Sequence, residues 1–191
     1  MKRLSIALIL SVVAASPAFA HLNPAEHGSF AAGFSHPLFG ADHILAMVGV
    51  GLWAFVVGGR AVWAIPLAFV ATMMLGFAAA LAGIGLPFVE PVIAASVVVL
   101  GLLALMALQV PTPVGMAMVG FFALFHGYAH GGEIGSATSL PFMVGFALAT
   151  ALLHAAGIGF AGNTLSHRGR IAARIAGGLT ALAGLWLVAG V

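Results

Sequence analysis

Long apolar runs, separated by short stretches of glycine, proline and polar residues, extend along almost the whole chain. Beyond the first twenty residues, six of these runs are about 20 residues long, the length that an α-helix needs to cross a bilayer. The predicted spans are 38–58, 61–83, 90–108, 112–131, 138–160 and 171–190. The pattern therefore predicts an all-α membrane protein in which residues 21–191 form a single six-transmembrane-helix bundle.

Glycine and alanine recur inside these runs, as in 76–85 and 174–184. Small residues allow membrane helices to approach closely, because lipid provides no hydrophobic drive for their association. The segments between the runs are short and rich in turn-forming residues, so no connection is long enough to form a separate domain. We expect a compact bundle.

The first twenty residues have the pattern of a cleavable signal peptide. Lys2 and Arg3 precede the apolar stretch 4–15, and "SPAFA" ends in small residues at Ala20. The apolar stretch is too short to span a bilayer comfortably, which disfavours the alternative of an uncleaved helix. Cleavage after Ala20 would leave His21 at the N-terminus, where its free amine and its imidazole together could chelate a metal.

The composition agrees with a membrane location, since 63% of the residues are hydrophobic and only 5% are charged. The chain has no cysteine, which excludes disulfides, thiolate metal sites and cysteine nucleophiles. After removal of the signal peptide, four arginines balance four acids, so the high isoelectric point does not indicate a nucleic-acid partner. Eight histidines remain as the main source of metal ligands.

The distribution of arginine predicts the orientation. Arg60 lies in the first connection between spans, and Arg168, Arg170 and Arg174 surround the fifth. The positive-inside rule assigns these connections to the cytoplasm. The predicted location is therefore the bacterial inner membrane, with the mature N-terminus in the periplasm.

On this topology the acids of the mature chain lie at or near the outer face, where their field attracts cations. They are Glu26, Asp42, Glu90 and Glu133.

The first polar motif is "HPLFGADH", residues 36–43, at the start of the first predicted span. Ionisable groups inside a membrane segment are costly, which makes His36, Asp42 and His43 candidates for function. His43 and Met47 are four residues apart and share a helical face. Asp42 is either a ligand or the group that orients a ligating histidine.

The second motif is "FHGYAHGGE", residues 125–133, at the outer end of the fourth span. His126 and His130 are four residues apart on one helical face, and Glu133 extends that face outward. Because the first span descends from the outside and the fourth returns to it, both motifs are predicted at one membrane level. Together they offer imidazoles and carboxylates suited to Ni(II), Co(II), Zn(II) or Cu(II) rather than to Mg(II) or Ca(II).

Other histidines outside the two motifs are candidates for an auxiliary metal path. His21 and His27 precede the first span and could capture a cation. An isolated helix histidine such as His154 is more often a hydrogen-bonded packing residue, and a place on the path toward the cytoplasm is the alternative.

The two motifs resemble the signatures of the HupE/UreJ family of hydrogenase- and urease-associated nickel permeases, and the resemblance covers the chain through all six spans. It implies secondary uptake of nickel or, in some members, cobalt. It assigns metal movement to His36, Asp42, His43, His126, His130 and Glu133. Intracellular nickel chaperones for hydrogenase or urease are the partners that it suggests, with the transported ion as cargo and no prosthetic group.

Three other functions are compatible with histidines in a membrane: a metalloenzyme, a bis-histidine haem protein, and a metal chaperone or sensor without transport. The hydrolase motif HExxH does not occur, which disfavours the enzyme. The single lysine, Lys2, lies in the predicted signal peptide, so no Walker motif is present and ATP hydrolysis by this chain is excluded.

Overall fold

A computed structural model describes residues 28–162 and 167–189, and this part of the chain contains helices and no strand. The elements are α3 (Ser29–Ser35), η1 (His36–Leu38), α4 (Ala41–Val57), α5 (Ala61–Leu81), α6 (Val89–Leu105), α7 (Thr112–Gly132), α8 (Ser139–Gly162) and α9 (His167–Val188). The predicted signal peptide and the residues His21, Glu26 and His27 lie outside the described residues.

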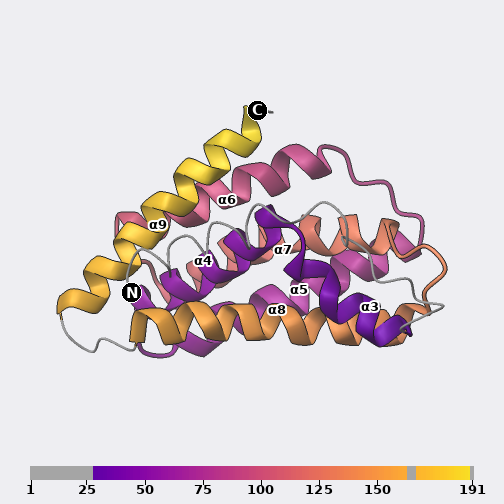
Figure 1. Cartoon of the computed structure of the whole chain (residues 1–191), viewed down its shortest axis with the longest axis horizontal. Coiled ribbons are helices and arrows are strands. Elements are labelled where there is room, and N and C mark those ends of the chain that lie inside the picture. The colour runs from indigo at the N-terminus through magenta and orange to yellow at the C-terminus, as the bar shows by residue number, and fades with distance from the viewer. Residues whose placement is uncertain (1–27, 163–166, 190–191) are drawn as a thin grey trace, which may run out of the picture.

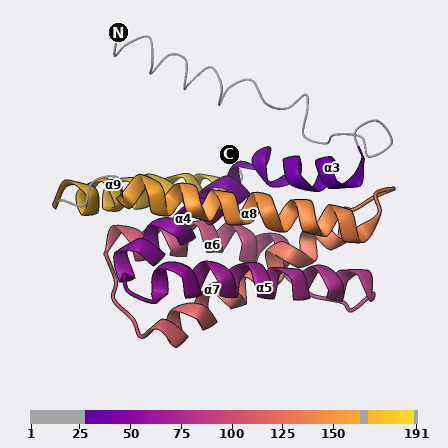
Figure 2. The same ribbon diagram turned by 90° about the horizontal axis from the view of Figure 1, so that it is seen from below.

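The helices form a bundle in which α4 is central. α4 packs mainly on α8 and also contacts α5, α6 and α9. α5 lies along α7, and α6 lies along α9. Figure 1 shows α3 beside one end of α8, while α9 crosses the bundle obliquely toward the other end. Figure 2 shows the same helices after a quarter turn, with α5 and α7 together on the side away from α9.

Four stretches of helix are long and apolar enough to cross a membrane: α5, α7, α8 and residues 169–188 of α9. The short helices α3 and η1 form a fifth candidate together with α4, although the two parts are bent by 78°. α6 has only 17 residues. Six continuous spans are therefore not confirmed, and the described residues give four candidates, or five with the bent pair.

The first predicted span, 38–58, contains a bend in the structure. Gly40 precedes α4 with an extended backbone (φ −92°, ψ 117°), so that helix begins at Ala41. Pro37 lies in the preceding turn of 3₁₀ helix. The predicted span continues across this bend because mean hydropathy does not respond to backbone direction.

Glycines bring the helix backbones into close contact, as the small-residue pattern predicts. A Cβ atom on Gly51 of α4 would collide with the carbonyl oxygen of His154 on α8. A Cβ atom on Gly127 of α7 would likewise collide with the carbonyl oxygen of Met73 on α5. Residues without a side chain are therefore required where these helices meet.

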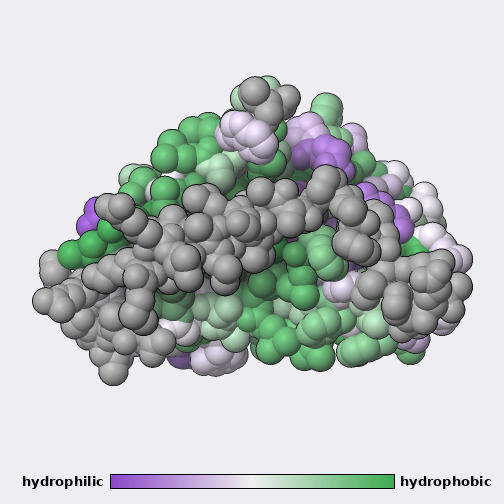
Figure 3. Space-filling view, viewed as in Figure 1, coloured by the Kyte–Doolittle hydropathy of each residue, from purple (hydrophilic) through white to green (hydrophobic). Residues whose placement is uncertain are grey.

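Large apolar side chains cover much of the outside of the bundle. Trp63, Leu67 and Leu179 are more than half exposed. Hydrophobic residues spread over much of the coloured face in Figure 3. Extended apolar surfaces of this kind suit contact with lipid rather than with water. Together with the apolar helices, they describe a multi-pass membrane protein.

Candidate metal centre

The two polar motifs meet at one end of the bundle. His36 belongs to η1, Asp42 and His43 to the first turn of α4, and His130 to the last turn of α7. The bend between η1 and α4 carries His36 to the side of α7, where its ring centroid lies 4.5 Å from that of His130. Residues almost a hundred positions apart in the chain thus share one cluster.

His43 is oriented by its neighbour in the chain. The Asp42 carboxylate lies 2.8 Å from Nδ1 of His43 and accepts its hydrogen bond. A neutral imidazole that donates from Nδ1 keeps its lone pair on Nε2. The contact also depends on Gly40, because a Cβ atom there would lie 2.8 Å from both the Asp42 oxygen and the His43 nitrogen.

His130 and His43 face each other across the α4–α7 interface. Their Nε2 atoms are in hydrogen-bond contact, although α4 and α7 have few other contacts. His130 is only 3% exposed, and its Nδ1 lies 3.6 Å from a carboxylate oxygen of Glu133. Since His43 donates from Nδ1 to Asp42, its Nε2 accepts and Nε2 of His130 donates in this contact. A carboxylate on Nδ1, as Asp42 provides for His43, directs Nε2 toward a metal in many metal sites.

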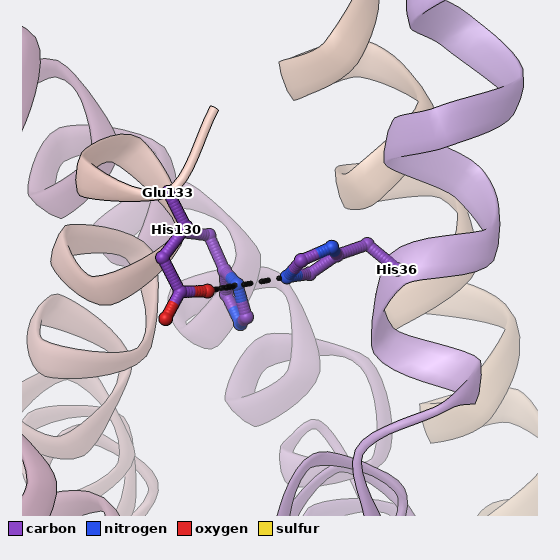
Figure 4. Close-up of side chains that lie close together, drawn as sticks. All are labelled: His36, His130 and Glu133. Atoms are coloured by element: carbon purple, nitrogen blue, oxygen red, sulfur yellow. Dashed lines mark ion pairs between the residues drawn. The ribbon is translucent and has the colours of Figure 1, made fainter. Parts of the chain in front are cut away.

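His36 and Glu133 complete the solvent side of the cluster. Nε2 of His36 lies 3.4 Å from a carboxylate oxygen of Glu133. His36, His130 and Glu133 each place one possible ligand atom within 4.8 Å of the other two. Figure 4 shows the His36 ring pointing across a gap toward His130 of α7 and toward Glu133, the C-cap residue of that helix. Atoms that bind one transition metal lie about 3–4 Å apart, so a small contraction would suffice for three ligands.

Glu133 is the charged group of this outer set. It follows α7 as the C-cap residue, and its side chain is 54% exposed. Hydrogen bonding by the imidazole of His130, and then by that of His36, holds the pKa of Glu133 well below its usual range. The residue is consequently a carboxylate near neutral pH and attracts cations to the cluster.

His126 lies one turn deeper on α7 and is fully buried. Its Nε2 lies 2.9 Å from the hydroxyl oxygen of Ser96 on α6. The Ser96 hydroxyl donates its proton to the carbonyl oxygen of Ile93 at 2.6 Å, so it accepts from Nε2 of His126. This leaves a lone pair on Nδ1 of His126, which has no partner among the described residues.

Ser96 was not singled out from the sequence. The signal available was a lone hydroxyl residue in the apolar run of α6. Serine is common in membrane helices, where its hydroxyl can bond the carbonyl of the preceding turn, so the residue type alone did not indicate a contact with His126.

Two cavities meet at Asp42. The smaller has a volume of about 170 Å³ and is lined by His36, Phe39, Gly40, Asp42, His43, His130 and Glu133. The larger, of about 450 Å³, is lined by Asp42 and by Glu90 at the start of α6. The predicted grouping of acids near the motifs therefore includes Asp42, Glu90 and Glu133 in the structure, and these acids border the approach to the imidazoles.

The auxiliary residues have different surroundings. Met47 is fully buried one turn beyond His43, as its spacing predicts. His154 of α8 is 1% exposed, but neither ring nitrogen has a hydrogen-bond partner in the part of the chain that the structure describes. The expectation of a hydrogen-bonded packing histidine is therefore wrong for His154.

Comparison with known proteins supplies independent information. A sequence profile of the HupE / UreJ protein family matches residues 8–187. Protein HupE from Rhizobium leguminosarum bv. viciae is 44% identical over 192 residues, which cover 100% of each chain. No solved structure matches this chain.

Proposed function

Since this chain belongs to the HupE/UreJ family, we propose that it is a secondary permease for a divalent transition-metal cation. The proposed cargo is Ni(II), which the protein takes up from the periplasm into the cytoplasm. The observation that carries the proposal is the contact between His43 and His130, which unites the two motifs in one cluster. The proposed cargo serves hydrogenase or urease maturation, and intracellular nickel chaperones are the proposed recipients.

The carboxylates of Glu133 and Glu90 first concentrate cations at the outer face. The ion then exchanges water for His36, His130 and Glu133, the three residues whose ligand atoms lie within 4.8 Å of one another. His130 has Nδ1 beside Glu133 and Nε2 beside His43, so a second nitrogen of the same ring is available when the ion moves to the pair of Nε2 atoms between α4 and α7. Neighbouring positions of moderate affinity allow the ion both to enter and to leave, as conduction requires.

Neutral imidazoles suit transport better than a closed cage of thiolates. Transport requires binding that is strong enough to replace water and weak enough to release the ion. Nitrogen ligands favour Ni(II), Co(II), Zn(II) and Cu(II) over the hard cations Mg(II) and Ca(II). Co(II) is the alternative cargo, since the ligand set accepts both ions.

The proposed location is the bacterial inner membrane, with residues 1–20 removed as a signal peptide and the mature N-terminus in the periplasm. The support is the position of Arg60, which is exposed between α4 and α5, at the opposite end of α4 from His43. The positive-inside rule assigns that end to the cytoplasm. We propose transport without an enzymatic activity and without a resident prosthetic group.

Uptake of radiolabelled nickel into cells that express the protein tests the proposal, with cobalt, zinc and copper as competitors. His43→Ala and His126→Ala should reduce uptake to the level of cells without the protein. His167→Ala, a change at the start of α9, is the matched control and should transport normally. Uptake equal to that of empty cells, or normal uptake by both cluster variants, would refute the permease.

A further inference from the structure

His154 is a buried polar residue that the outer cluster does not use. It lies on α8, is 1% exposed, and has two ring nitrogens without a partner among the described residues. A neutral imidazole always carries one N–H donor and one lone pair, so both are unsatisfied in either tautomer. Buried polar groups are nearly always hydrogen-bonded, and an exception calls for a specific explanation.

The position of His154 relates it to the innermost histidine of the cluster. The ring of Phe69 on α5 lies 5.1 Å from that of His154 and 5.8 Å from that of His126, between ring centroids. Both histidines therefore contact the same aromatic side chain. His126 also has an unpartnered nitrogen, Nδ1, so lone pairs are available next to Phe69 on both α7 and α8.

Other donor atoms lie beside His154. Thr150 is one turn before it on α8 and lies on the same helical face. The hydroxyl of Thr150 is 3.6 Å from the thioether sulfur of Met73, which is one turn beyond Phe69 on α5. Thr150 and Met73 are both fully buried. The α5–α8 interface thus combines an imidazole, a hydroxyl and a thioether.

The rest of the buried interior offers few other polar side chains that could receive an ion. In residues 28–162 and 167–189, the buried polar side chains outside the outer cluster are Ser35, Ser96, Thr150, His154 and Thr180. Ser35 bonds the backbone of its own helix, and Ser96 is occupied by His126. An ion that leaves His126 for the interior therefore has Thr150 and His154 as the buried polar partners on α8.

We propose that His154, with Met73 and Thr150, forms a second cation site that receives a transition-metal ion from His126. This proposal rests on the proposed function of the outer cluster. Imidazole nitrogen and thioether sulfur favour a borderline or soft cation and discriminate against Mg(II) and Ca(II). His154 also borders a groove of about 400 Å³ between α5 and α8, whose other lining residues are apolar.

The number of ions bound per chain tests the deeper site directly. The full-length protein in lipid nanodiscs is equilibrated with radiolabelled Ni(II), and wild type is compared with His154→Leu and with Thr180→Val, a control at a buried polar position of α9. We expect His154→Leu to bind one ion fewer per chain and Thr180→Val to match wild type. Equal binding by wild type and His154→Leu would overturn the deeper site.

Met73→Leu gives a second test that conserves the volume of the side chain. X-ray absorption of the nickel-loaded wild type should show sulfur scattering, which Met73→Leu should abolish while nitrogen scattering persists. Absence of sulfur scattering in wild type would overturn the ligand set. His43→Ala separates the two proposals. If wild type binds nickel, His43→Ala does not, and His154→Leu binds as much as wild type, only the deeper site is overturned. If wild type binds no nickel, both proposals are refuted.

Discussion

The carboxylate of Asp42 lies 2.8 Å from Nδ1 of His43, so the acid and the imidazole that form this pair are consecutive residues of α4. The pairing turns Nε2 of His43 toward His130 on α7. In the sequence, Asp42 could equally have been a metal ligand or the group that orients one. The geometry favours orientation, because the oxygen nearest to His43 is already occupied by its N–H group.

Replacing Asp42 should weaken metal binding while the helix bundle remains folded. Asp42→Ala removes the acceptor that fixes the His43 tautomer, and losses of this kind reduce metal affinity by roughly 10–100-fold. Asp42→Asn keeps an acceptor oxygen but not the charge, so its affinity should fall between those of wild type and Asp42→Ala. Calorimetric titration of the purified protein with Ni(II) measures the order, and wild-type affinity in Asp42→Ala would contradict the orienting role.

Acidification should reduce transport through protonation of imidazole and not of Glu133. The pKa of Glu133 is lowered in the folded protein, so its stabilising charge is fully present above the ordinary value of 4.5 and is lost only as pH falls through the lower folded value. Imidazole ordinarily titrates near pH 6.5. At about this pH, protons therefore compete with the metal ion for the ring nitrogens.

Nickel uptake by proteoliposomes, with equal pH on both sides, provides the measurement. We expect uptake to decline between about pH 7.5 and 5.5, the range in which histidine titrates. Glu133→Gln should lower uptake at every pH but leave the midpoint in this range. A midpoint near pH 4.5 in wild type would instead assign the dependence to a carboxylate of ordinary pKa.

Ser96→Ala should disturb the cluster from α6, although Ser96 belongs to neither motif. The change removes the acceptor for Nε2–H of His126 and leaves that buried group unpaired, at a cost of about 1–3 kcal/mol. The ring is then free to change tautomer, so nickel affinity should fall about tenfold or more. Ser96→Thr retains the hydroxyl and should bind more tightly than Ser96→Ala. Titration of both variants checks the order, and equal affinities in the two would contradict it.

Two glycines of α8 should respond differently to the same substitution. A Cβ atom on Gly157 would collide with the carbonyl oxygen of Val48 on α4, whereas one on Gly159 would meet no atom within 4 Å. Gly157→Ala should destabilise the protein by about 1–3 kcal/mol, the usual cost of overpacking. Gly159→Ala should be neutral or stabilising by up to about 1 kcal/mol, because alanine is the better helix former. Thermal unfolding in detergent measures both, and equal midpoints would be inconsistent with close packing of α4 on α8.

Hydropathy was sufficient to predict helices and most of their ends. α5, α7 and α8 each begin and end within two residues of the predicted 61–83, 112–131 and 138–160. It was insufficient where the backbone changes direction within a predicted span. The bend before Ala41 and the left-handed conformation of Ala107 after α6 have no hydropathy signature, so a continuous first span and a full-length third span were predicted.

The cluster was predictable because helix topology and residue spacing act together. The topology placed both motifs at one level, and the i, i+4 spacing placed His126 and His130 on one face of α7. The contact between His36 and His130 was not predictable, since it depends on the bend after η1. The lack of a hydrogen-bond partner for His154 was also not predictable from the sequence, because it depends on the side chains that α5 presents to α8.

Transport by the purified protein alone tests the central claim most directly. Proteoliposomes that contain wild type or His130→Ala are supplied with radiolabelled Ni(II), and the metal retained inside the vesicles is measured over time. Both proteins should reconstitute, and wild type should accumulate nickel, whereas His130→Ala should match protein-free vesicles. No accumulation by wild type, or equal accumulation by His130→Ala, would contradict transport through the cluster of His43 and His130.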